Sequence, residues 1–234
     1  MLNKRQNNLL LITPSLDKQI EDIKQKIYLA MNGIVSEKMT QYGFFYKQNF
    51  GVSIPQLRNI AAQYNKNQDL AKRLWLLNIR ETMIIATMIA DESKLSAEDL
   101  RHWLSECSNM ELIEQICMNL LARSSFSNQL AISLAQSENA HEKMAGFLLS
   151  ARIYKQFSEK EIEELVSIGI ENSSDTDYYL YKSISLSFSR LSRKSREVAN
   201  YILKSIDSFE KSKSSSQQFI LKELKEEIAF FYQQ

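Results

Sequence analysis

The scarcity of glycine and proline is the feature that most constrains the fold of this chain. Only 5 glycines and 2 prolines occur in 234 residues, whereas these residue types together make up about 12% of an average protein. Turns that need a positive φ or a fixed proline ring must therefore be few. Sandwiches, barrels and doubly wound α/β folds contain many such turns. The composition therefore favours helices that are joined by short polar turns.

Helix-start signals recur along the chain at a nearly constant interval. Starts are expected near Asn67, Ser96, Phe126, Ser158 and Ser195, which lie 29, 30, 32 and 37 residues apart. A second helix fits between each start and the next. A two-helix unit with this period is typical of a helical solenoid, in which each pair buries its apolar face against its neighbours. We therefore predict an all-α protein, an α-solenoid of antiparallel helix pairs.

Three further helices are expected before these repeats, starting at Pro14, Ser36 and Ser53. The first is expected to end near Gly33 and the second near Gly43. No stretch rich in proline or glycine divides the chain, and the lysine- and serine-rich segment 211–216 is explained by a loop between the last two helices. We therefore predict a single domain over residues 1–234.

Charge and rare residue types exclude several classes of function. The 29 Lys and Arg residues balance 28 Asp and Glu residues, so no global excess indicates a charged partner. Cys107, Cys117 and His102 lack metal-ligand spacing, and no phosphate-binding glycine loop or nucleophile elbow is present. We expect no metal and no cofactor. The apolar run Leu9–Ile12 is too short for a signal peptide or a membrane span, so we expect a cytoplasmic protein without a membrane partner.

A more specific pattern occupies the first half of the chain. Residues 50–58 read Phe-Gly-Val-Ser-Ile-Pro-Gln-Leu-Arg, and they are followed by Leu74-Trp75, Arg80-Glu81 and the apolar segment Ile85–Asp91. In this order and spacing the residues resemble the DNA alkylation-repair family of HEAT-like repeat proteins, the AlkD-like glycosylases. The resemblance covers roughly residues 36 to 200.

The resemblance implies a fold and a chemistry. It implies a curved superhelix of HEAT-like or ARM-like repeats, with a concave basic groove that holds duplex DNA. Members of this family excise cationic alkylated purines, such as 3- and 7-methylpurines, without drawing the base into a pocket. A carboxylate beside the deoxyribose can stabilise the oxocarbenium character of the transition state, and aromatic rings and an arginine hold the sugar and phosphate in place.

The resemblance also implies site residues, each of which departs from the family pattern. The family's Ser-Trp-Asp-x-x-Asp corresponds to residues 109–114, so Met110 replaces the Trp and Glu114 replaces the catalytic Asp. Glu111 lies three residues earlier and can share a helix face with Glu114. The family's Arg falls on Lys143 and its later Trp on Leu186. These matches imply Glu114 and Glu111 as the catalytic pair and Met110, Lys143 and Leu186 as DNA contacts.

Additional DNA contacts are expected from a local basic cluster that contains Arg190, Arg193, Lys194 and Arg196. Lys and Arg side chains near serine hydroxyls suit phosphate contact, which supplies most non-specific DNA affinity. A solvated turn between two helices explains the same cluster nearly as well. Further cations of the family-like segment are expected to add to the DNA-binding surface: Arg58, Lys72, Arg73 and Arg80.

The substitutions leave the activity open. Glu is one methylene longer than Asp, Lys lacks the planar fork of Arg, and Met and Leu offer no ring face. Three functions are therefore compatible with the sequence. The first is a glycosylase acting on alkylated duplex DNA. The second is a family member that binds duplex or branched DNA without excision. The third is a helical-repeat scaffold whose groove binds a protein partner.

Overall fold

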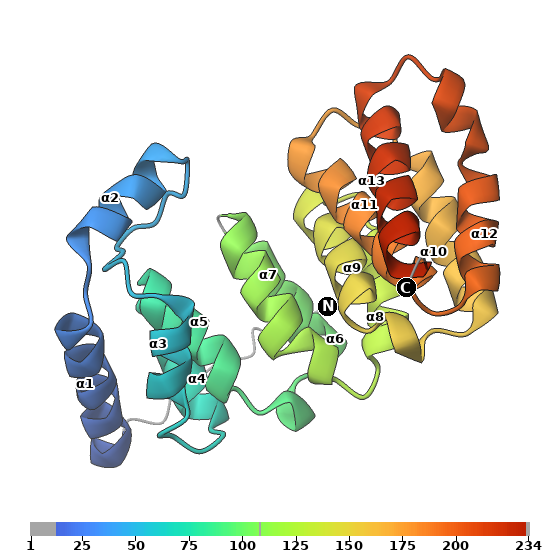
Figure 1. Cartoon of the computed structure of the whole chain (residues 1–234). Coiled ribbons are helices and arrows are strands. Elements are labelled where there is room, and N and C mark those ends of the chain that lie inside the picture. Colours follow the sequence, from blue (N-terminus) through green and yellow to red (C-terminus); the bar gives the residue numbers. More distant parts are fainter. Residues whose placement is uncertain (1–12, 108, 233–234) are drawn as a thin grey trace, which may run out of the picture. The chain divides into compact units, whose positions relative to one another are not determined.

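A computed structural model describes residues 13–107 and 109–232, and in these residues it contains thirteen α-helices, four short 3₁₀ helices and no strand (Figure 1). The prediction of an all-α fold is confirmed. The apolar run Leu9–Ile12 lies outside the described residues. Among the described residues, no helix has both the length and the apolar character that a membrane span requires.

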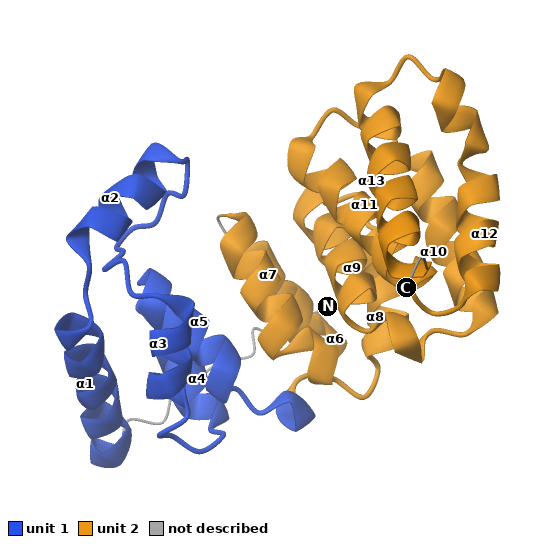
Figure 2. Cartoon of the chain, viewed as in Figure 1, with its two compact units in different colours: residues 1–94 blue, residues 95–234 orange. Residues whose placement is uncertain are grey.

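The chain groups into two compact units, residues 1–94 and residues 95–234 (Figure 2). Each unit has its own buried apolar core. One of the two tryptophans lies in each core, Trp75 in the first unit and Trp103 in the second. The single domain over residues 1–234 stays a prediction.

The first unit contains five α-helices and a 3₁₀ turn: α1 (Pro14–Leu29), α2 (Gly33–Gln41), α3 (Ile54–Ala61), α4 (Gln68–Leu76), α5 (Arg80–Ile89) and a turn at Glu92–Lys94. The predicted starts of α1 and α3 are confirmed, with Thr13 and Ser53 as N-caps. The start predicted for α2 was wrong by three residues. The Asn32 side chain accepts a hydrogen bond from the Val35 N–H and caps the helix there, so Ser36 lies inside it.

The second unit contains eight α-helices: α6 (Ala97–Ser105), α7 (Met110–Asn119), α8 (Ser127–Ala135), α9 (Ala140–Arg152), α10 (Glu159–Glu171), α11 (Tyr178–Ser192), α12 (Arg196–Ser205) and α13 (Ser215–Tyr232). Its 3₁₀ helices are Leu121–Arg123, Tyr154–Gln156 and Asp207–Lys211. Every predicted repeat start is confirmed within one residue, including that of α4 in the first unit. Asn67, Ser96, Ser158 and Ser195 cap their helices through their side chains, whereas Phe126 precedes α8 without a side-chain cap.

The lysine- and serine-rich segment 211–216 is shorter as a loop than predicted. The preceding 3₁₀ helix extends to Lys211, and α13 begins at Ser215, so only residues 212–214 lie between them. Ser216 is buried, and its hydroxyl donates to the Ser173 carbonyl at 2.8 Å. That buried hydrogen bond explains why the serines continue into the helix instead of extending the loop.

The second helices of the repeats form one layer of the second unit, in the order α7, α9, α11 and α13, and each packs against the next (Figure 1). Small side chains allow the close approach between α9 and α11, where the Ser150 and Ser187 hydroxyls lie 2.7 Å apart and buried. The first helices α8, α10 and α12 pack behind this layer. The layer places residues of α7, α9 and α11 near one another.

Candidate nucleic-acid interface

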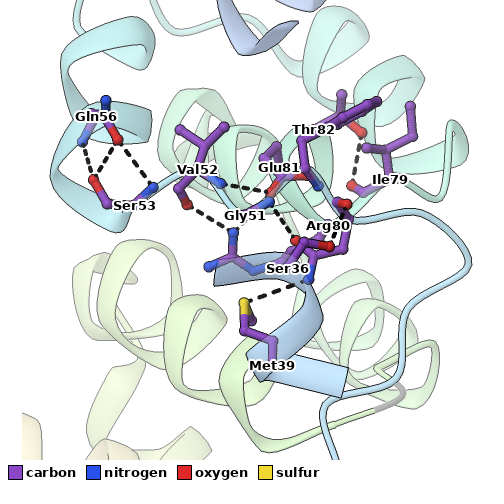
Figure 3. Close-up of polar contacts among 12 residues, drawn as sticks. Ser36, Met39, Gly51, Val52, Ser53, Gln56, Ile79, Arg80, Glu81 and Thr82 are labelled. Carbon is purple, nitrogen blue, oxygen red and sulfur yellow. Dashed lines mark hydrogen bonds and ion pairs between the residues drawn. The ribbon is translucent and has the colours of Figure 1, made fainter. Parts of the chain in front are cut away.

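The residues that carry the family-like pattern in the first unit form a buried polar cluster (Figure 3). Arg80 Nη1 donates to the Val52 carbonyl at 2.8 Å and to Glu81 Oε1 at 2.9 Å. Both side chains are buried, with 3% of Arg80 and 0% of Glu81 exposed. Since a buried charge is costly without a partner, the two residues stabilise each other. The expectation that Arg80 adds a surface cation was wrong.

Glu81 also holds the loop that precedes α3. Its carboxylate accepts a hydrogen bond from the Val52 N–H at 3.3 Å (Figure 3). It also accepts one from the Phe50 N–H at 3.1 Å. Gly51 lies between them with φ +70°, and a Cβ there would lie 2.1 Å from the Asn32 carbonyl oxygen. Only glycine fits this position. The buried residues of the family-like motif therefore build the fold of the first unit.

Of the other three cations predicted for the first unit, one is paired within the protein and two are at least partly accessible. Arg73 Nη2 forms an ion pair with Asp17 at 2.5 Å, which joins α4 to α1. Arg58 is exposed and Lys72 is half-buried. Trp75 is part of the core, so it offers no ring to a ligand.

The two predicted catalytic carboxylates lie on α7 in the second unit. Met110 is the first residue of that helix and is half-buried, as is Glu111, while Glu114 is exposed one turn further on. The pKa of Glu114 lies above its usual value, because neighbouring protein atoms reduce its solvation and because the Glu111 charge opposes its ionisation. The nearby Lys182 ammonium of α11 acts in the opposite direction. The spacing on α7 therefore places two carboxylates near each other on one helix, with the Lys182 ammonium close to Glu114.

Lys143 on α9 is held at the end of a neighbouring helix. Its Nζ donates to Asn172 Oδ1 at 2.7 Å, and Asn172 is the C-cap residue of α10. The Asn172 amide nitrogen in turn donates to the Ile168 carbonyl at 2.8 Å. The Lys143 ammonium therefore lies beside the loop that leads from α10 into α11.

Leu186 lies in a row of accessible side chains on α11. Tyr178, Lys182, Leu186 and Arg190 follow one another at four-residue intervals, so they share one helix face; we name this row the α11 strip. Leu186 is 39% exposed. Lys182 Nζ donates to the Tyr178 hydroxyl at 3.0 Å. In the described part of the chain, the half-buried Arg190 side chain has no hydrogen-bonded or ion-paired partner.

The remaining cations of the predicted basic cluster bind within the protein. Arg193 forms an ion pair with Glu227 of α13, and its guanidinium lies 5.3 Å from the Phe231 ring centre. Lys194 donates to the Phe157 carbonyl. Arg196 Nη2 donates to the Tyr232 carbonyl at 3.1 Å. These residues join helices together, which leaves Arg190 as the member of the cluster that is available on the α11 strip.

Sequence reasoning missed Lys182 and the tyrosines that precede it. The signal was present, because positions 182 and 178 precede the predicted contact Leu186 by four and eight residues on a helix. An aromatic run at the start of a predicted helix is more often part of the core. Tyr178 and Tyr179 are instead 48% and 44% exposed.

No cluster of three or more possible metal-ligating side chains occurs among residues 13–107 and 109–232. His102 is exposed and lies 3.7 Å from Glu106. Cys107 and Cys117 are both buried, as expected for small apolar side chains. Burial raises the pKa of the Cys107 thiol to about 12 and also raises that of Cys117.

Comparison with known proteins bears on the fold and the family. Residues 23–220 match the family described as DNA alkylation repair enzyme. A solved structure from a family related to the HEAT-like repeat DNA glycosylases, with affinity for branched DNA structures, aligns with a TM-score of 0.75 and 17% identity over 88% of this chain and 94% of that one. This likeness confirms the HEAT-like helical repeat fold.

Two further comparisons add little. A designed armadillo repeat protein in complex with a (KR)4 peptide aligns with a TM-score of 0.43 and 10% identity, over 92% of this chain and 95% of that one. That likeness is too distant to support an argument. No curated protein matches the chain significantly.

Proposed function

The chain belongs to the DNA alkylation repair family, and from that premise we propose that it binds DNA with the phosphate backbone against Lys182 and Arg190, the two cations of the α11 strip in the second unit. The observation that carries the proposal is the pair of cations on this strip. Arg190 is unpartnered within the described residues, and Lys182 is exposed. An arginine that is not engaged within the fold can donate two hydrogen bonds to one phosphate. The basic concave groove that the resemblance implies stays a prediction.

The acidic neighbours set the expected strength of this binding. Glu114 lies on α7 near Lys182, and Glu111 lies near Glu114, so these carboxylates reduce the local positive potential. Few phosphates are therefore neutralised, and the affinity should be modest and should fall with salt by about 0.9 logarithmic units per phosphate contact for each tenfold rise in salt. The related protein of known structure has affinity for branched DNA. We propose duplex DNA, either alkylated or branched, as the partner here.

The decisive measurement is the fluorescence anisotropy of labelled duplex and four-way-junction DNA across a salt series. Arg190→Glu should weaken binding several-fold and lower the salt slope, because a phosphate contact is lost. Lys160→Glu makes the same change of charge on α10, behind the layer that holds the strip, and should change binding little. Equal effects of the two variants, or no binding at low salt, would refute the proposal.

Excision of cationic alkylated purines is a second candidate, and the position of Glu114 favours it. The carboxylate is exposed on the same helix layer as the strip. When the bond between C1′ and the purine nitrogen breaks, its electron pair leaves with the purine, which becomes neutral. The ionised Glu114 carboxylate would stabilise the positive charge that develops on the sugar. Water then adds to C1′ and releases a proton.

A base-release assay on methylated duplex DNA tests this candidate. Glu114→Gln should lower the rate at least ~10-fold, because the amide keeps the shape and loses the charge. If the natural chain releases no base, the combined change Met110→Trp, Glu114→Asp and Lys143→Arg should restore release. These groups act as a unit, so single changes are uninformative. Excision by the natural chain at a rate that Glu114→Gln leaves unchanged would contradict the assignment.

The compartment and the domain organisation follow from the same premise. A protein that binds DNA must be located in the compartment that contains the DNA. We propose that this protein is located in the cytoplasm. We also propose that residues 1–234 work as one domain, with both units needed for full affinity.

A further inference from the structure

A cluster of aromatic rings surrounds the beginning of α11 and has no part in the proposed phosphate contacts. Tyr178 lies 5.5 Å from Tyr179 and 5.5 Å from Tyr181, measured between ring centres. Tyr181 lies 5.4 Å from Phe219 of α13. All three pairs are arranged edge to face, a favourable geometry for aromatic rings. The cluster therefore extends from the packed helix pair to the surface.

The two outer rings are both exposed, and the Tyr178 ring is held by its neighbours. Tyr178 and Tyr179 remain 48% and 44% exposed. The Lys182 ammonium donates to the Tyr178 hydroxyl at 3.0 Å and lies 5.1 Å from its ring centre. Tyr181 supports Tyr178 from the side of α13. A ring that is already ordered loses little conformational freedom when a ligand stacks on it.

The charges around the rings select the part of DNA that can lie there. The Asp177 carboxylate caps α11 directly before Tyr178, and the Glu114 and Glu223 carboxylates act on Lys182. These three negative charges offset the Lys182 ammonium beside Tyr178, so a phosphate group next to the rings is held less well than one at Arg190. A neutral base has no such conflict, and it can stack on an aromatic face irrespective of its identity. Arg190 lies two turns beyond Lys182, about 12 Å along the helix, where it can hold a phosphate of the same strand.

We propose, on the basis of the DNA binding proposed above, that Tyr178 and Tyr179 stack on unpaired bases of DNA. Bases within a continuous duplex are stacked on one another, so their faces are unavailable to a tyrosine. Bases at a gap, flap or bulge are available. The protein should therefore bind DNA that contains unpaired nucleotides more tightly than fully paired duplex of the same length.

The experiment uses the full chain and DNA in which the fluorescent base 2-aminopurine occupies an unpaired position. Stacking of this base on tyrosine should quench its fluorescence, and the affinity should exceed that for paired duplex about 10-fold. The double change Tyr178→Ala and Tyr179→Ala should abolish both the quenching and the preference, while binding to paired duplex is kept. The double change to Phe keeps the rings and should keep both.

The matched control is Tyr201→Ala, which removes a tyrosine of similar exposure (39%) from α12. It should leave the quenching and the preference unchanged. Binding of both DNAs with equal affinity, or a preference that survives the change to Ala, would overturn this inference and leave the phosphate contacts intact. Loss of all DNA binding by the natural chain at low salt would instead overturn the proposed function and this inference with it.

Discussion

Replacement of the buried Glu81 by Gln should destabilise the first unit by about 3 kcal/mol. Removing one partner of a buried ion pair typically costs about 3–5 kcal/mol, and here Arg80 would remain buried without its counter-charge. The Gln oxygen can still accept one of the two hydrogen bonds from the Phe50 and Val52 N–H groups. Its amide nitrogen would face the other N–H, which has no acceptor left. Because the Gln oxygen keeps one of these hydrogen bonds, we expect a loss near the lower limit of the range of about 3–5 kcal/mol.

The two tryptophans allow the first unit to be measured by itself. A chain of two compact units need not unfold in one transition. In a Trp103→Phe background, Trp75 of α4 is the remaining tryptophan and reports on the first unit. Urea titrations followed by Trp75 fluorescence give the free energy of unfolding with and without the Glu81→Gln change.

A surface ion pair is the control for this measurement. In the first unit, Glu21 Oε1 of α1 lies 2.9 Å from Lys24 Nζ, and the Glu21 side chain is 70% exposed, so Glu21→Gln should change the stability of this unit by less than about 0.5 kcal/mol. A double change of Arg80→Met with Glu81→Gln should cost less than the two single changes added together, because no uncompensated charge remains. A loss below about 1 kcal/mol for Glu81→Gln would refute the structural role given to this pair.

Three further predictions concern single positions. Gly51→Ala should lower the urea midpoint of the first unit by the equivalent of at least ~2 kcal/mol, because of its φ of +70° and the 2.1 Å contact, whereas Gly33→Ala, with no atom within 4 Å, should be neutral or slightly stabilising. If excision is observed, its rate should fall as the pH is lowered through the pKa of Glu114, and this fall should lie above pH ~4.3, the usual pKa of a glutamate, because the pKa of Glu114 is raised. A rate–pH profile measures the position of the fall, and a fall centred at or below that pH would contradict the prediction. In the folded protein at pH 8, Cys107 and Cys117 should react only slowly with a thiol reagent, because burial raises both thiol pKa values and the thiolate is the reactive form. The reaction should become fast when urea unfolds the second unit, and a fast reaction of the folded protein would disprove the burial of the two thiols.

The helix starts were predictable from the sequence because their causes are local. Ser96 and Ser158 each form a capping box with the residue three positions later, and such a pattern is fully visible in sequence. The start of α2 was misplaced because two adequate caps lie close together, and the choice of Asn32 depends on a tertiary contact. The Asn32 N–H donates to the Phe50 carbonyl at 2.8 Å, which no local pattern reveals.

The candidate site was predictable only in outline. The positions of Glu111, Glu114 and Leu186 on helix faces follow from their spacing. Whether a cation is available to a ligand depends on its neighbours in space, which cannot be identified from the sequence. Arg193 and Arg190 are three residues apart on one turn, yet Arg193 is bound to Glu227 of α13 while Arg190 is not. For the same reason Arg80, which was expected as a surface cation, is buried beside Glu81 in the structure.

Helix α11 has one face that is buried in the fold and another that is accessible at the surface. Its buried face consists largely of serines, with Leu180, Ile184, Phe188 and Leu191 among them, and this face fixes its packing against α9 and α13. The strip on the opposite face contributes little to that packing, and substitutions at exposed positions usually change stability by no more than about 0.5 kcal/mol. Selection, or an engineer, can therefore exchange strip residues one at a time without loss of the scaffold. Leu186 and the exposed tyrosines two turns away can accordingly vary independently of the packed face.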